Sequence, residues 1–169
     1  ADCFENTDSI QVDLSAGVSE VMQHLISSGF HRIAHATFIR KHSPSAARRF
    51  GYVKAMNRAK LKPEFIYYPL TEHQRIIARR LIQDYIGENG CPEAIFCHSD
   101  DVALGIYRGL CDMKLRVPED VALVGCDGIQ DTEYLECQIT TLVQPVAAMC
   151  ATAWQFLTQR MDHSTTKPQ

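Results

Sequence analysis

The sequence predicts an α/β fold in which a doubly wound, mainly parallel β-sheet carries helices on both faces. Short apolar segments alternate along the chain with amphipathic segments of about 13 to 17 residues, which is the pattern of βαβ units. The segment 121–124 is apolar throughout, as expected for a strand that helices cover on both sides. These two observations favour one layered domain built around a parallel sheet.

The N-terminal half is expected to contain two helices and two strands. Apolar residues spaced three and four apart predict helices at residues 15–28 and 46–59. The second helix includes Gly51, which costs about 1 kcal/mol relative to alanine in a helix interior. Short runs rich in β-branched, aromatic and small apolar residues predict strands at 32–38 and 65–68.

The C-terminal half continues the alternation. Thr71 and Gln74 have the spacing of a capping box and are expected to open a helix that runs to about residue 86. Ser99 is expected to cap the next helix, with Asp100 and its neighbour in the first turn, at the positive end of the helix dipole. The remaining expected elements are strands at 94–97, 121–124 and 139–143 and a helix from Pro145 to about Met161.

The composition indicates a folded cytoplasmic domain. Of the 169 residues, 46% are hydrophobic, which is enough for a sizeable core. The formal net charge of -3 lacks the positive excess that direct binding to nucleic acid requires. The seven cysteines contain no C-x-x-C pair and are expected to be free thiols in a reducing compartment. The sequence shows no secretory signal and no apolar run of membrane length, so no membrane association is expected.

A ligand site is expected beyond the carboxyl ends of the predicted strands, where open parallel sheets bind their ligands. Asp127 follows an apolar strand and precedes Gly128, so its carboxylate can accept hydrogen bonds from two vicinal hydroxyls. Arg48 can donate a fork of hydrogen bonds to ligand oxygens. An acid and a guanidinium in one cleft suit a neutral polyol. The alternatives are that Asp127 only caps a turn and that Arg48 is a solvated helix residue.

The same loops do not favour catalysis. His98, Ser99 and Asp100 contain the atoms of a hydrolase triad, but neighbouring side chains diverge and cannot pass a proton along a line. The G-x-S-x-G, G-x-G-x-x-G and P-loop motifs are missing from the sequence, and no set of residues has metal-ligand spacing. We therefore expect no enzymatic activity, no cofactor and no metal. His98 and Ser99 remain candidates for ligand contact.

Several sequence fragments occur in an order that is shared with a known family. They are VDLSAG (12–17), GFHRIA (29–34), RRFGY (48–52), DVALGI (101–106), LRVPEDVALVG (115–125), DGIQDTEY (127–134) and ITTLVQP (139–145). Over residues 10–161 the chain thus resembles the effector-binding domain of the lactose-repressor/galactose-repressor (LacI/GalR) family of bacterial transcription regulators. The resemblance implies a two-lobed, periplasmic-binding-protein-like fold that binds a small effector, such as a sugar, between its lobes.

The resemblance also implies roles for individual residues. Arg48 corresponds to the arginine that these proteins direct at the ligand, and Asp127 to the aspartate that binds sugar hydroxyls. Ser99 stands where the family usually has an asparagine beside the ligand, and Cys126 where it often has an aromatic residue. Val146 corresponds to a position that also lines the pocket. The two departures, Ser99 and Cys126, leave the class of effector open.

The domain organisation follows from the same resemblance. Residues 13–144 are expected to form most of the C-terminal lobe, whereas 1–12 and 145–169 are expected to belong with an N-terminal lobe outside this sequence. Operator DNA would be bound only through a helix-turn-helix head that is also outside it. A homodimer is expected, because these regulators read two-fold operators. Leu104 and Leu135 match the family's dimer face, although Leu104 alternatively belongs to the core.

Two other functions remain open at this point. A sugar-binding protein of a transport system has the same fold and differs in its compartment, which the cysteines and the missing signal argue against. An enzyme of doubly wound fold would use Asp127 and His98 as an acid/base pair. Of the two, the enzyme is the less favoured.

Overall fold

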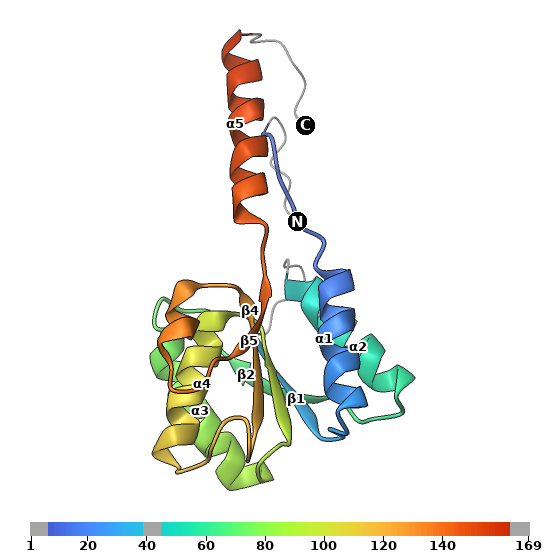
Figure 1. Cartoon of the computed structure of the whole chain (residues 1–169), viewed down its shortest axis with the longest axis vertical. Coiled ribbons are helices and arrows are strands. Elements are labelled where there is room, and N and C mark those ends of the chain that lie inside the picture. Colours follow the sequence, from blue (N-terminus) through green and yellow to red (C-terminus); the bar gives the residue numbers. More distant parts are fainter. Residues whose placement is uncertain (1–6, 39–44, 163–169) are drawn as a thin grey trace. The chain divides into compact units, whose positions relative to one another are not determined.

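The computed structural model describes residues 7–38 and 45–162, and the chain in it divides into two compact units (Figure 1). The larger unit, Leu14–Val143, contains the β-sheet and four of the α-helices. The smaller unit combines Ala1–Asp13 with Gln144–Gln169 and contains one long helix. No helix among the described residues is both long and apolar enough to cross a membrane.

The larger unit is built on a five-stranded sheet in the order β2-β1-β3-β4-β5. All four strand pairs are parallel, which confirms the predicted fold class. Because every strand runs in the same direction, the carboxyl ends of all five meet at one edge of the sheet. The strands are β1 (Ile33–Phe38), β2 (Glu64–Tyr68), β3 (Ala94–Cys97), β4 (Ala122–Asp127) and β5 (Thr140–Val143).

Helices cover both faces of the sheet, as predicted. The helices α1 (Ser15–Ser27) and α2 (Ser45–Arg58) pack together on one face, and α3 (Gln74–Asn89) and α4 (Asp100–Asp112) pack together on the other (Figure 1). Alternate residues of each strand point to opposite faces, so the sheet separates two buried apolar clusters. On β3, for example, Ile95 joins the cluster under α3 and α4, whereas Phe96 joins the cluster under α1 and α2.

Gly51 lets α1 and α2 approach closely. A Cβ atom at this position would come within 2.8 Å of Cγ1 of Val18 on α1. The glycine that lowers the intrinsic stability of α2 therefore has a packing role, which the sequence pattern does not reveal.

Two predicted boundaries are wrong. The helix α3 begins at Gln74, and Thr71 does not cap it, because the Thr71 hydroxyl instead accepts a hydrogen bond from the backbone N–H of His73 at 3.3 Å. The strand β4 extends beyond residue 124 as far as Asp127, which pairs with Val143 of β5. The predicted cap of α4 is confirmed, because Oγ of Ser99 accepts a hydrogen bond from the N–H of Val102 at 3.3 Å.

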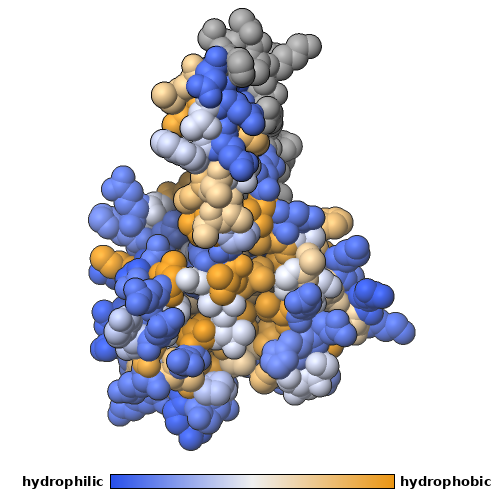
Figure 2. Space-filling model, turned by 45° about the horizontal axis from the view of Figure 1, so that its top comes forward, coloured by the Kyte–Doolittle hydropathy of each residue, from blue (hydrophilic) through white to orange (hydrophobic). Residues whose placement is uncertain are grey.

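The described part of the smaller unit contains α5 (Val146–Asp162) and residues 7–13. The guanidinium of Arg160 binds the carboxylate of Asp8, with one N···O distance of 3.0 Å. No residue of α5 is buried. Hydrophobic as well as hydrophilic side chains accordingly reach the surface that α5 forms (Figure 2). The large exposed hydrophobic residues of α5 follow the spacing of a single helix face and are Val146, Trp154, Leu157 and Met161.

Candidate functional site

The candidate site lies at the carboxyl edge of the sheet. The last residues of β2 and β4 are Tyr68 and Asp127, and His98 directly follows β3. A loop after β1 is also expected at this edge, but its residues 39–44 lie outside the described residues. Arg48 stands in the first turn of α2.

Arg48 of α2 and Asp127 of β4 are in contact although 79 residues separate them in the chain. Nη2 of Arg48 lies 3.3 Å from Oδ1 of Asp127, and Nε of Arg48 lies 3.1 Å from Sγ of Cys126. The Arg48 residue is buried, with 7% of its surface exposed, so it is not the solvated helix residue of the alternative interpretation. The Asp127 side chain is 30% exposed, so solvent reaches part of the pair. Their opposite charges leave the pair neutral.

Asp127 adopts a strained backbone conformation. Its φ angle is 134°, a value that residues other than glycine rarely adopt. Such residues persist only where the surrounding structure determines their conformation, and they concentrate at functional sites. The backbone conformation of Asp127, the last residue of β4, thus supports its choice as a candidate site residue.

A buried carboxylate holds the residues that follow Asp127. Asp100 is fully buried, and its Oδ2 accepts hydrogen bonds from the N–H groups of Gly128 and Ile129 at 2.6 and 2.9 Å. Its Oδ1 accepts a third bond from the Thr141 hydroxyl at 2.6 Å. Gly125 makes room for this group, because a Cβ there would lie 2.0 Å from Oδ1. Asp100 is therefore a positioning residue for Asp127.

The sequence interpretation missed this role of Asp100. It assigned the residue only to the first turn of α4, where the structure indeed finds it. A weak signal was present, because Gly125 and Gly128 surround Asp127 and indicate a close approach by another group. Nothing in the sequence pattern names Asp100 as that group.

His98 and Ser99 lie at the same edge but differ in their bonding. Oγ of Ser99 already accepts the capping hydrogen bond of α4, so the role that the Ser99 hydroxyl can offer a ligand is that of a hydrogen-bond donor. The His98 ring contacts the Phe38 ring edge-on at 4.6 Å, and its Nδ1 is buried without a hydrogen-bond partner. Burial, with smaller contributions from the charges of Arg48 and His35, lowers the pKa of His98 to about 3. The imidazole is therefore neutral near neutral pH and poorly matched to acid/base catalysis.

The other predicted site residues are placed as follows. Val146 belongs to the smaller unit, where 57% of it is exposed. Leu104 is half-buried on α4, and Leu135 is half-buried against the cluster beneath α3 and α4. In the described part of the chain, no group of three or more His, Cys, Asp or Glu side chains is arranged to hold a metal ion.

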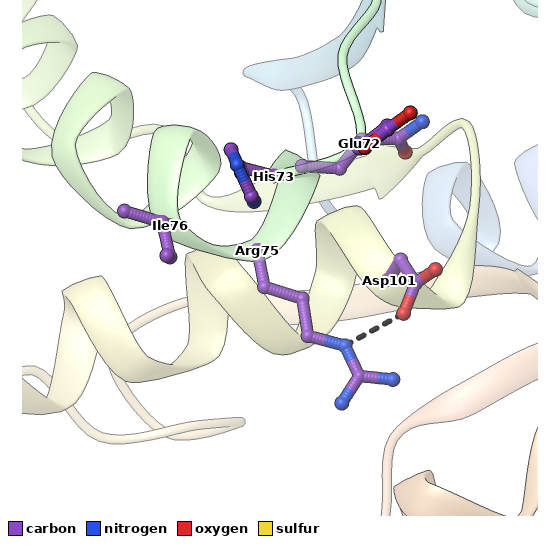
Figure 3. Close-up of a pocket in the computed structure, with 6 residues that line it drawn as sticks. Glu72, His73, Arg75, Ile76 and Asp101 are labelled. Atoms are coloured by element: carbon purple, nitrogen blue, oxygen red, sulfur yellow. Dashed lines mark hydrogen bonds and ion pairs between the residues drawn. The ribbon is translucent and has the colours of Figure 1, made fainter.

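A separate shallow depression of about 230 Å³ lies where α3 begins (Figure 3). Arg75 crosses from α3 to α4 there, because its Nε binds Oδ1 of Asp101 at 2.6 Å. Its Nη2 also lies 3.4 Å from Oδ2 of Asp131, in the short helix η1 (Gln130–Tyr134). These side chains are half exposed, so their ion pairs contribute little to stability. The depression is a surface feature on the α3 and α4 side of the larger unit.

Comparison with known proteins adds a family and several relatives. The family model for the periplasmic binding protein-like domain matches residues 22–169. The HTH-type transcriptional repressor PurR of Escherichia coli is 28% identical over 163 residues, which make up 96% of this chain and 48% of the repressor. The chain thus spans about half the length of the curated relatives it matches.

Solved structures give the same picture of the fold. An uncharacterized protein from Actinobacillus succinogenes is 25% identical with a TM-score of 0.85, and the match covers 99% of this chain and 62% of that one. A complex of the transcriptional regulator CelR with cellobiose is also 25% identical, with a TM-score of 0.80 and coverage of 97% and 50%. The arrangement of strands and helices found here is therefore shared with longer proteins.

Proposed function

The chain belongs to the periplasmic binding protein-like domain family, which includes the effector-binding domains of LacI/GalR regulators, and we propose that it senses a small effector. The sensed effector would control a transcription regulator. The effector is a neutral polar molecule, such as a sugar. The domain binds it without catalysis, and the regulator's DNA-binding head lies outside this sequence.

The observation that carries this proposal is the contact between Arg48 and Asp127 at the carboxyl edge of the sheet. A guanidinium donates hydrogen bonds and a carboxylate accepts them, so together they match the hydroxyl groups of a neutral polyol. The pair carries no net charge and therefore does not favour an ionic ligand. The binding of cellobiose by CelR supports a sugar as the effector.

We further propose that this chain supplies one lobe and part of another. Residues 13–144 form most of the C-terminal lobe, and 1–12 with 145–169 belong to an N-terminal lobe that other sequence completes. The apolar face of α5 supports this assignment, because no residue of α5 is buried although Trp154 and Met161 are large and hydrophobic. Val146 of the same helix is the further residue that this proposal assigns to effector contact.

In this proposal the regulator is a cytoplasmic homodimer. The helices α3 and α4 and the 3₁₀ helix η1 form the dimer face, with Leu104 and Leu135 as contacts. Exposed apolar residues on the same elements support this choice, because Ile76 of α3 is 57% exposed and Tyr134 of η1 is 79% exposed. The described cysteines are all free, which suits a reducing compartment better than the extracellular one of a transport protein.

Calorimetric titration of the regulator with a panel of neutral sugars and nucleobases tests the effector proposal. Arg48→Ala and Asp127→Asn should each weaken binding of the compound that binds by at least about tenfold, equivalent to about 1.4 kcal/mol. Arg49→Ala is the matched control, because Arg49 is the exposed neighbour of Arg48 on α2. Unchanged affinity in both site variants would refute the proposed site, and turnover that is lost in Asp127→Asn would favour the enzyme alternative.

A further inference from the structure

Several buried polar atoms in the described part of the chain lack a hydrogen-bond partner, and two of them belong to Tyr68 and His98, which are close enough to Arg48 to be affected by its charge. Among the described residues, four buried side-chain atoms lack a hydrogen-bond partner: Nε2 of His35, Oγ1 of Thr37, Oη of Tyr68 and Nδ1 of His98. Such atoms are rare in folded proteins, because a buried polar group that makes no hydrogen bond lowers stability. Each one therefore needs an explanation, and an absent binding partner is one of the few available.

Three of these atoms lie on neighbouring strands at the carboxyl edge of the sheet. In the pairing of β1 with β2, Tyr68 is opposite Phe38, the residue after Thr37. The backbone N–H of His98 donates to the carbonyl of Ala36 at 2.9 Å, which holds His98 beside the end of β1. The order β2-β1-β3-β4 thus places Tyr68, Thr37, His98 and Asp127 along one edge.

The Phe38 ring fixes the orientation of two of these side chains. Its centroid is 6.0 Å from that of Tyr68 and 4.6 Å from that of His98, and both contacts are edge-on. The Tyr68 hydroxyl and the His98 nitrogen are therefore held on rigid rings, and not on flexible chains. Rigid donors and acceptors bind with little loss of side-chain entropy.

Both groups are uncharged and close enough to the charged pair to respond to it. Burial raises the pKa of Tyr68 well above its usual range; the charges of Cys97 and Asp127 add to this rise and that of Arg48 opposes it. Burial and the charge of Arg48 lower the pKa of His98 to about 3. A neutral tyrosine can donate and accept a hydrogen bond, and so can a neutral imidazole through its two nitrogens.

We propose that Tyr68 and His98 form a second part of the effector site, in which Oη of Tyr68 and Nδ1 of His98 bind a neutral hydrogen-bonding group of the effector. This inference rests on the proposed function. The group is a hydroxyl or an N–H beside the part that Arg48 and Asp127 bind. The effector is uncharged at this end, because Tyr68 and His98 are neutral and the charge of Arg48 is already balanced by Asp127.

The test uses the regulator and the compounds of the panel, with each sugar paired with its phosphate ester. Tyr68→Phe removes only the hydroxyl, and His98→Leu removes the polar atoms of the ring. Each should weaken binding of the neutral compound by about tenfold. His98→Asn retains a polar atom at the Nδ1 position and should restore most of the affinity. The phosphate esters should bind more weakly than the parent sugars.

A spectroscopic measurement separates contact from folding defects. On addition of the binding compound, the nitrogen chemical shift of His98 Nδ1 should change, whereas that of the exposed His73 should not. If a compound binds through Arg48 and Asp127 but Tyr68→Phe and His98→Leu keep full affinity and the Nδ1 shift is constant, the inference is wrong and the proposed function stands. If no compound in the panel binds, both are refuted.

Discussion

Two buried neutral histidines should make this fold sensitive to mild acid. His35 lies in β1, is fully buried, and stacks on the Phe96 ring at 4.9 Å. Its Nδ1 is 2.8 Å from the Phe96 carbonyl, so Nδ1 carries the proton and Nε2 is left as a buried acceptor without a partner. A second proton would place a charge in the core. Burial, with a smaller effect from Arg48 and Arg49, lowers the pKa of His35 to about 4, and that of His98 is about 3.

The sign of the effect follows from proton linkage. The unfolded chain binds protons at both histidines below a pKa of about 6.5, whereas the folded chain does so only near pKa values of about 4 and 3. Stability from these groups is therefore complete above about pH 6.5 and falls as the pH decreases towards the folded pKa values. As the pH falls from about 7 to about 5, each histidine should lower the free energy of unfolding by about 2 kcal/mol, and both together by about 4 kcal/mol.

Urea unfolding at a series of pH values measures this loss directly. The variant His35→Asn keeps a donor for the Phe96 carbonyl but cannot be protonated in this range. It should reduce the dependence of the free energy of unfolding on pH by about half. His24→Gln, at an exposed position of α1, is the control and should leave the dependence as in the wild type. If His35→Asn and the wild type lose equal stability between about pH 7 and about pH 5, the account of His35 is incorrect.

Three further predictions concern the residues that shape the fold around the site. Asp100→Asn should lower the free energy of unfolding by about 3 kcal/mol, because an amide has only one accepting oxygen and cannot replace the acceptors at both Oδ1 and Oδ2. A loss below about 1 kcal/mol would refute the role assigned to this residue. Gly51→Ala should destabilise the domain by about 1 to 3 kcal/mol, because the new Cβ would lie 2.8 Å from Val18 of α1. Gly87→Ala should stabilise the domain by about 0.5 kcal/mol, because its Cβ would meet nothing within 4 Å. If urea unfolding shows that both variants change the free energy of unfolding in the same direction, the packing argument is wrong. Ser99→Ala should lower the free energy of unfolding by about 1 kcal/mol because α4 loses its cap, whereas Thr71→Ala should change it very little. Thermal unfolding of both variants measures the difference; a large loss in Thr71→Ala would instead support the capping box that the sequence predicted.

The periodicity of the sequence was sufficient to predict the elements and the class of the fold. Apolar spacing located each α-helix and each strand, because these elements bury one face and apolar residues recur at the spacing of that face. It did not indicate the short 3₁₀ helix η1. Apolar spacing gave the wrong boundary where the end of an element depends on a contact with another part of the structure. The extension of β4 to Asp127 depends on pairing with β5, and the late start of α3 depends on the turn that Thr71 makes.

The candidate site was predicted only in part, for a similar reason. Arg48 and Asp127 were found because their chemistry and their places after strands are visible in the sequence. Their contact spans 79 residues of chain, so it appears only in the folded structure. The bonds of Asp100 reach 28 and 41 residues along the chain, and Tyr68 was interpreted only as part of a strand. Buried polar atoms leave no periodic pattern, so sequence reasoning had no signal for them.

The carboxylate of Asp100 also determines when the loop after β4 becomes ordered. It takes the place of water as the partner of two successive amide groups, at Gly128 and Ile129, so the loop is fixed as the domain folds. These residues therefore lose their conformational entropy when the domain folds. A ligand that binds at Asp127 does not have to order them again, so this entropy does not weaken its binding. The amide hydrogens of this loop should accordingly exchange with solvent as slowly as those of the neighbouring strands.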